Sequence, residues 1–261
     1  LLQHTSNLYY TEPCALLARD LCERTGFQKA FFCNSGAEAN ECAMKLARKY
    51  SFDTYGEGRG TVVTLENSFH GRTMATLAAT GQAEYHNYFY PFPQGYRYTP
   101  PNDIDALKTA LGEPDVCALL IEVIQGEGGV MPLEEDFVKA ARALCTEKDI
   151  VLICDEVQSG IGRTGKLFAF EHYGFMPDVA TAAKGLGNGL PVGACLAAGR
   201  FADVLTPGTH ASTFGGNPVV CAGARVVLET LDDALLAEIV AKGEYIAGKL
   251  RSNPEIAQVR G

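Results

Sequence analysis

The sequence predicts an α/β protein in which helices cover both faces of a mostly parallel central sheet. Three observations predict this class: helical and strand-like patterns alternate, the strand-like runs are short and apolar, and polar clusters follow directly after them. The run from Val151 to Cys154 is apolar at every position, which is typical of a strand with helices on both sides. Such sheets bind ligands beyond the carboxyl ends of their strands, where these polar clusters fall.

The elements can be assigned in chain order from their periodicity and their end signals. Ala39, Ala43 and Leu46 recur at helical spacing, and Asn217 followed by Pro218 is a typical helix start. Polar clusters follow the strand-like runs after Leu65, Ile121 and Cys154. The expected helices span 15–25, 37–50, 133–149, 217–231 and 234–251, and the expected strands span 60–66, 116–124 and 150–157.

Composition narrows the function classes. With 261 residues, 47% of them hydrophobic and 20% charged, the chain is typical of a globular protein. The net charge of −9 and the absence of a basic cluster argue against a nucleic-acid or acidic-membrane partner. No apolar run approaches the roughly 18 to 20 residues of a membrane span, and no signal-peptide pattern is visible. We therefore expect a cytoplasmic protein, although a transit peptide in a preceding segment stays open.

The nine cysteines are scattered, show no C-x-x-C spacing and often sit inside apolar runs. This pattern favours buried, reduced thiols over a disulfide framework or a metal site. We expect no bound metal.

Two charged residues mark the expected edge of the sheet. Asp155 ends a buried strand, where a carboxylate is unfavourable unless a cation or hydrogen-bond donor meets it. Lys184 lies 29 residues later, about one helical crossover away, and is followed by glycines. Taken singly, Asp155 is compatible with a helix cap or a salt bridge, and Lys184 with a surface lysine. Together they suggest a low-dielectric pocket in which an amine attacks an aldehyde while small residues admit a flat ligand.

Two further motifs add a phosphate and a ring to this hypothesis. Ser35, Gly36 and Ala37 follow an apolar run and open a helix, so their amides are expected to point outward as an anion site. Phe69 follows another strand-like run, with Arg72 three residues further on. A ligand with a phosphate, a flat ring carrying a basic nitrogen, and an aldehyde fits all of these groups. Pyridoxal 5′-phosphate (PLP) is such a ligand.

At this point the sequence resembles the class III aminotransferases of fold type I, and among them the acetylornithine aminotransferase group. The matching segments are "NSGAEANE", "SFHGRT", "IQGEGG", "DEVQSGIGRTG", "AKGLGNGLPVGA" and "STFGGNP", in the order of the family. The resemblance implies transfer of the terminal amino group of N2-acetylornithine to 2-oxoglutarate, in arginine biosynthesis. It also implies that residues 1–232 form a large cofactor-binding domain without its N-terminal segment, and that 233–261 lead into a truncated small domain.

The resemblance also implies roles for single residues. Lys184 is similar to the Schiff-base lysine, and Asp155 to the partner of the pyridine nitrogen. The cofactor would further contact Ser35, Gly36, Ala37, Phe69 and Gln158, with Thr213 reaching the phosphate of the partner subunit in a homodimer with shared active sites. The amino-acid and 2-oxo-acid substrates would meet Arg72, which binds a carboxylate, Glu127, which is similar to the family's gate glutamate, and Ser212. Val123 departs from the family, which has proline there.

Other functions remain open from the sequence alone. Relatives that act on ornithine, succinylornithine, diaminopimelate or 4-aminobutyrate share most of these motifs. A nicotinamide-dependent dehydrogenase would need G-x-G-x-x-G between a strand and a helix, whereas "GLGNG" follows a lysine and precedes a proline. A non-catalytic fragment that keeps the fold as a scaffold is a further alternative.

Overall fold

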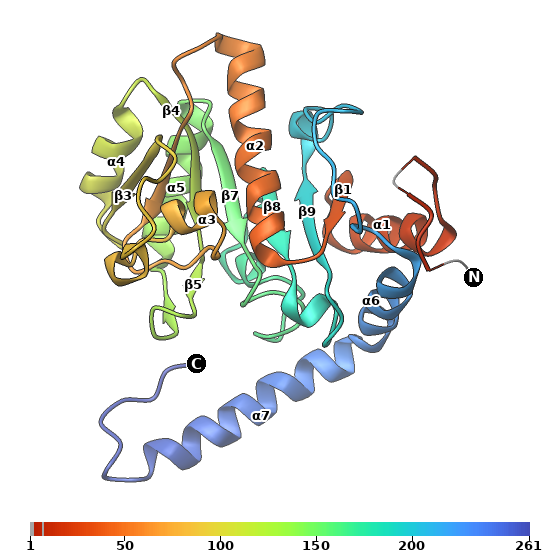
Figure 1. The fold of residues 1–261 in the computed structure, drawn as a ribbon. Coiled ribbons are helices and arrows are strands. Elements are labelled where there is room, and N and C mark those ends of the chain that lie inside the picture. The colour runs from red at the N-terminus through yellow and green to blue at the C-terminus, as the bar shows by residue number, and fades with distance from the viewer. Residues whose placement is uncertain (1–2, 7) are drawn as a thin grey trace.

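The computed structural model describes residues 3–6 and 8–261 and shows a seven-stranded sheet between layers of helices (Figure 1). The strand order is β1-β9-β8-β7-β4-β2-β3. β9 is antiparallel to both of its neighbours, and every other neighbouring pair in this sheet is parallel. The predicted fold class is therefore confirmed.

The elements have the following bounds. The helices are α1 (Glu12–Thr25), α2 (Gly36–Tyr55), α3 (Met74–Ala79), α4 (Ile104–Gly112), α5 (Glu135–Glu147), α6 (Pro218–Thr230) and α7 (Asp233–Arg251), and the short 3-10 helices are η1 (Ala83–His86), η2 (Ala169–Tyr173), η3 (Lys184–Leu186) and η4 (Gly199–Phe201). The strands are β1 (Lys29–Cys33), β2 (Thr61–Leu65), β3 (Tyr96–Thr99), β4 (Val116–Ile121), β5 (Ile124–Gln125), β6 (Met131–Pro132), β7 (Val151–Asp155), β8 (Val179–Ala182) and β9 (Gly193–Ala197).

The two faces of the sheet pack into two hydrophobic cores. In β7, Val151 and Ile153 join the core under α2, whereas Leu152 and Cys154 join the core that α1, α4, α5 and α6 cover. Since successive side chains of a strand point to opposite faces, a strand buried on both sides must be apolar throughout. This is the physical reason that the apolar run 151–154 predicted its surroundings correctly.

Residues typical of helix caps predicted the ends of several helices correctly. α1 ends at Gly26, whose φ of 79° is accessible to glycine and whose amide donates to the Cys22 carbonyl. The Asn217 side chain accepts from the Val220 amide at 3.1 Å and caps α6. The expected strand 116–124 is wrong after Ile121, because β4 ends there and β5 pairs with β6 in a separate two-stranded sheet.

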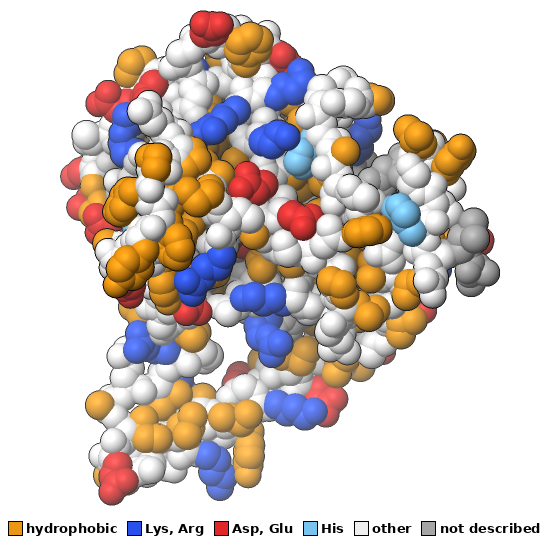
Figure 2. All heavy atoms as spheres, viewed as in Figure 1, with side chains coloured by type: hydrophobic (Ala, Val, Ile, Leu, Met, Phe, Trp, Pro, Cys, Tyr) orange, Lys and Arg blue, Asp and Glu red, His pale blue; other side chains and the backbone are white. Residues whose placement is uncertain are grey.

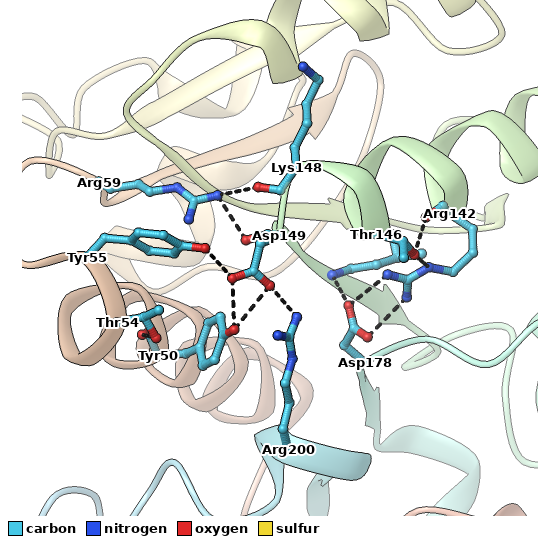
Figure 3. A network of polar contacts seen from close by, with 11 residues as sticks. Tyr50, Thr54, Tyr55, Arg59, Arg142, Thr146, Lys148, Asp149, Asp178 and Arg200 are labelled. Carbon is cyan, nitrogen blue, oxygen red and sulfur yellow. Dashed lines mark hydrogen bonds and ion pairs between the residues drawn. The ribbon is translucent and has the colours of Figure 1, made fainter.

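A polar network lies at the N-terminal ends of the parallel strands (Figure 3). Ligands of such folds bind at the opposite, C-terminal ends. Asp149, just before β7, accepts hydrogen bonds from the hydroxyls of Tyr50 and Tyr55 on α2 and pairs with Arg200 on η4. Arg59 donates to the Asp149 carbonyl at 2.8 Å. These contacts join α2, β7 and η4, and so hold the strand that carries Asp155 against the helix that begins at Gly36.

α7 extends beyond the sheet and its helices (Figure 1). It packs on the loop after β7, where an added Cβ at Gly165 would lie 2.2 Å from Val240, and Ala247 is the one buried residue of this helix. A domain boundary between 232 and 233 stays a prediction, and residues 1, 2 and 7 of that predicted domain lie outside the described residues.

Two further sequence expectations can be compared with the structure. No helix in the described part of the chain is long and apolar enough to cross a membrane. All nine cysteines are free thiols, and seven of them are buried.

Candidate active site

A cavity of about 420 Å³ lies at the carboxyl edge of the sheet, where the segments after β2, β4, β7 and β8 meet the start of α2. Most of the predicted site residues line it. They are Ser35, Gly36, Ala37, Phe69, Arg72, Glu127, Asp155, Gln158 and Lys184. The polar clusters that follow three strand-like runs of the sequence therefore do converge in space.

Asp155 and Lys184 come to this cavity from two neighbouring parallel strands. Asp155 is the last residue of β7 and lies beside Thr181 of β8, three residues before Lys184. Both residues line the same cavity. The hypothesis required this juxtaposition, because the two groups were expected to contact one flat ligand.

A buried hydrogen-bond network fixes the Asp155 carboxylate. Asp155 is 4% exposed, and its Oδ2 accepts from Asn40 Nδ2 at 2.7 Å and from His70 Nδ1 at 2.8 Å. Its Oδ1 accepts from the Val157 amide at 3.0 Å. Asn40 in turn accepts from the Thr181 hydroxyl at 2.8 Å. Because these partners belong to α2, β8 and the segments after β2 and β7, the carboxylate has one orientation at the cavity wall.

Two members of this wall, Glu122 and His70, had no predicted role. Glu122 is 5% exposed and accepts from the Phe69 amide at 2.9 Å. Burial raises the pKa of Glu122 to about 7, and the nearby Asp155 adds to the shift while His70 opposes it. His70 Nε2 is buried without a hydrogen-bond partner in the described residues. His70 and Asn40 lie inside the motifs "SFHGRT" and "NSGAEANE", which was the only sequence signal for them.

The start of α2 carries the three residues predicted to bind an anion, and all three line the cavity. Ser35 caps the helix, and its Oγ accepts from the Glu38 amide at 3.2 Å. The amides of Gly36 and Ala37 belong to the first turn, where no intrahelical acceptor exists. A Cβ at Gly36 would lie 2.5 Å from Val157 Cγ1, so close packing on the loop after β7 requires glycine. Gly36 and Ala37 line the cavity at the positive end of a 20-residue helix.

The surroundings of Lys184 differ from the expectation in one respect. Lys184 is exposed in this chain, so the chain alone does not provide the low-dielectric pocket on which the hypothesis relied. The glycines after it are also needed by the turn itself. A Cβ at Gly187 would lie 2.0 Å from the Leu190 carbonyl oxygen, and Gly189 has a φ of 105°. Lys184 itself has a φ of 42°, in the left-handed region.

One cluster joins Tyr85 to three residues that line the cavity: Phe69, Arg72 and Glu127. The Arg72 guanidinium carbon lies 5.4 Å from the Phe69 ring centre and 4.4 Å from the Tyr85 ring centre. The Tyr85 hydroxyl donates to Glu127 Oε1 at 3.2 Å. Tyr85, on η1, was not predicted, because no local pattern connects it to either charged residue.

Gln158 lines the same cavity as Lys184 and Asp155, whereas Ser212 and Thr213 do not. The Gln158 side chain packs on Gly126, where an added Cβ would lie 1.5 Å from its Oε1. Ser212 and Thr213 line a neighbouring cavity, and Ser212 Oγ accepts from Asn34 Nδ2 at 3.0 Å. Within one chain, the structure therefore does not bring these two residues together with Lys184 and Asp155. In the described residues, no group of three or more His, Cys, Asp and Glu side chains is arranged to hold a metal ion.

The fold and the cavity define a class of protein. The sequence model of the class-III aminotransferases matches residues 1–261, and the chain belongs to this family. Its members depend on PLP. The chain is 51% identical over 260 residues to an acetylornithine aminotransferase of Haemophilus ducreyi, with all of the chain and 66% of the relative covered. It therefore spans about two thirds of the length of this relative.

Two solved structures are similar. An ornithine aminotransferase from Toxoplasma gondii, in which PLP partly occupies the active site, superimposes with a TM-score of 0.94 at 35% identity, covering 100% of this chain and 64% of that one. The N-acetylornithine aminotransferase from Stenotrophomonas maltophilia gives a TM-score of 0.82 at 38% identity, covering 99% and 64%.

Proposed function

We propose that this chain carries the cofactor site of an aminotransferase that moves the terminal amino group of N2-acetylornithine to 2-oxoglutarate, a reaction of arginine biosynthesis. The observation that carries the proposal is that Lys184 and Asp155 line one cavity, at the ends of neighbouring strands. The 51% identity to an acetylornithine aminotransferase supports the choice of substrate.

The residues around the cavity fit PLP. The Gly36 and Ala37 amides offer donors to a phosphate at the start of α2. The buried Asp155 carboxylate, held by hydrogen bonds from Asn40 and His70, offers an acceptor to a protonated ring nitrogen. Phe69 offers an aromatic side chain to the ring, and Lys184 a primary amine to an aldehyde. Gln158 and Ser35 supply further polar groups on the same wall.

When bound, PLP supplies an electrophilic aldehyde and a ring that accepts electrons. The protein's own groups do the rest. Lys184 Nζ would hold the cofactor between turnovers and would then accept a proton from the substrate carbon that bears the amino group. Asp155 would favour the protonated, electron-accepting form of the ring, and its three hydrogen bonds hold the carboxylate in place without reorganisation. Arg72 offers a substrate carboxylate a bidentate partner.

Two further elements of the proposal depend on groups outside this chain. Glu127 would pair with an arginine of the small domain when the donor is bound and release it when glutamate is bound. Thr213 would reach the phosphate of the partner subunit, so each site would need a homodimer. Exposed hydrophobic side chains support such an assembly, including those gathered near α3 and η1 (Figure 2). They include Tyr9, Tyr10, Met74, Tyr88, Phe89, Tyr90 and Phe214.

The nine free thiols support a reducing compartment such as the cytoplasm.

Lys184→Ala and Asp155→Ala test the two central roles in the cofactor-loaded enzyme. Lys184→Ala should abolish the absorbance of lysine-bound cofactor and its fixation by borohydride, whereas Lys166→Ala, an exposed control, should keep both. Asp155→Ala should keep the lysine-bound cofactor but lower turnover by orders of magnitude. Near-parental turnover of Asp155→Ala, or borohydride fixation in Lys184→Ala, would contradict these roles.

A panel of donors tests the substrate. Turnover of N2-acetylornithine, N2-succinylornithine, ornithine and 4-aminobutyrate with 2-oxoglutarate should be greatest, as kcat/KM, for N2-acetylornithine. A greater kcat/KM for one of the others would transfer the assignment to that relative. No turnover of any donor, with cofactor bound, would favour the scaffold alternative.

A further inference from the structure

Tyr85 connects the two charged residues on the substrate side of the cavity. Its ring lies under the Arg72 guanidinium at 4.4 Å, and its hydroxyl donates to Glu127 Oε1 at 3.2 Å. Phe69 packs edge-on against the same ring, with ring centres 5.8 Å apart and planes at 84°. Arg72 and Glu127 line the cavity. Tyr85 therefore contacts both the candidate carboxylate-binding group and the candidate gate through different parts of one side chain.

The two contacts of Tyr85 have different physical effects. The ring face attracts the Arg72 cation and restricts where the guanidinium can lie, which prepares it for a carboxylate. The hydroxyl gives the exposed Glu127 carboxylate a partner within this chain. The hydrogen bond to Glu127 raises the pKa of the Tyr85 phenol, so the phenol keeps its proton and stays a donor at neutral pH.

When Tyr85 donates a hydrogen bond to the Glu127 carboxylate, Glu127 attracts nearby cations less strongly. It also repels the second carboxylate of a dicarboxylic substrate less strongly. This matters most for a ligand with two carboxylates, because one of them binds Arg72 while the other must pass or replace the charge of Glu127. A donor with a single carboxylate needs Arg72 but does not meet this repulsion.

We propose that Tyr85 is a positioning residue that orients Arg72 with its ring and holds Glu127 with its hydroxyl, and that it thereby sets the affinity of the site for dicarboxylic substrates. This inference rests on the proposed function and adds to it a specificity-determining residue for the acceptor half of the reaction.

Three variants of the cofactor-loaded enzyme separate the two contacts. Tyr85→Phe keeps the ring and loses the hydrogen bond, and Tyr85→Leu loses both. Tyr98→Phe is the matched control, because Tyr98 donates to the Ala78 carbonyl at 2.6 Å and contacts neither Arg72 nor Glu127 in the described structure. KM and kcat are measured for N2-acetylornithine and for 2-oxoglutarate, and the dissociation constant of glutarate, a non-reacting dicarboxylate, is measured by calorimetry.

Tyr85→Phe should raise the KM for 2-oxoglutarate and the dissociation constant of glutarate about 3- to 10-fold, the value of one partly exposed hydrogen bond to a charged group. Its KM for the amino donor and its kcat should change less than about twofold. Tyr85→Leu should raise both KM values, about threefold or more, because a cation–π contact is also lost. Combined with Glu127→Gln, Tyr85→Phe should have no further effect on glutarate binding, since the carboxylate it holds is gone.

Two results overturn the inference and leave the proposed function intact. One is an active Tyr85→Phe enzyme with parental glutarate affinity. The other is an equal rise of both KM values in Tyr85→Phe and Tyr98→Phe, which would indicate a structural role. An inactive parental enzyme that still binds glutarate more tightly than Tyr85→Phe would instead remove the proposed reaction and keep the positioning role.

Discussion

Asn40→Leu tests how far the buried network defines the candidate site. Asn40 is 1% exposed and makes three hydrogen bonds: to Asp155 Oδ2 at 2.7 Å, to the His70 carbonyl at 2.8 Å, and from the Thr181 hydroxyl at 2.8 Å. Leucine has a similar size, so the loss is electrostatic rather than a cavity. The bond to the charged carboxylate contributes about 2 kcal/mol and each neutral bond about 1 kcal/mol, which gives about 4 kcal/mol of lost stability.

Equilibrium unfolding in urea, at one protein concentration and without cofactor, measures this loss. Thr181→Val is the matched control, because it removes only the bond between Thr181 and Asn40 and should cost about 1 kcal/mol. Asn40→Leu should also weaken cofactor binding, since Asp155 loses one of its fixed donors. If Asn40→Leu is no less stable than Thr181→Val, the network does not hold the carboxylate as we reason.

Two further changes test the packing and the buried acids. Gly36→Val should abolish cofactor binding, measured by absorbance titration, because its side chain would collide with Val157, whereas Gly60→Ala should be silent since no atom lies within 4 Å of the added Cβ. The pKa of Glu156 is raised by burial to about 7 from an ordinary 4.5, so the folded state binds more protons between these values and stability should fall as pH rises through this window, by about 3 kcal/mol. Urea unfolding from pH 5 to 8 should show this slope, and Glu156→Gln should reduce it; an equal slope in both proteins would refute the assignment.

Much of the fold could be predicted because its signals are local. The run 151–154 is apolar at each position, and this pattern alone indicates a strand covered on both faces. Asn217 and Gly26 marked helix ends because caps act through hydrogen bonds to residues only three or four positions away. Short strands such as β3 and β8, four residues each, carry too few positions for a pattern.

Some features of the site, like those of the fold, could be predicted from the sequence, and others could not. The sequence by itself determined the family, much of the sheet, and the position of Asp155 at the end of a buried strand, because each of these follows from motifs read within a short window. Only the tertiary structure decided that Asn40 and His70 hold Asp155, across 115 and 85 residues of chain, and that Tyr85 joins Arg72 to Glu127. It also decided that Lys184 is exposed and that its glycines shape a turn. Hydrogen bonds and packing between segments far apart in the sequence depend on how the whole chain folds. A local sequence pattern does not contain this information.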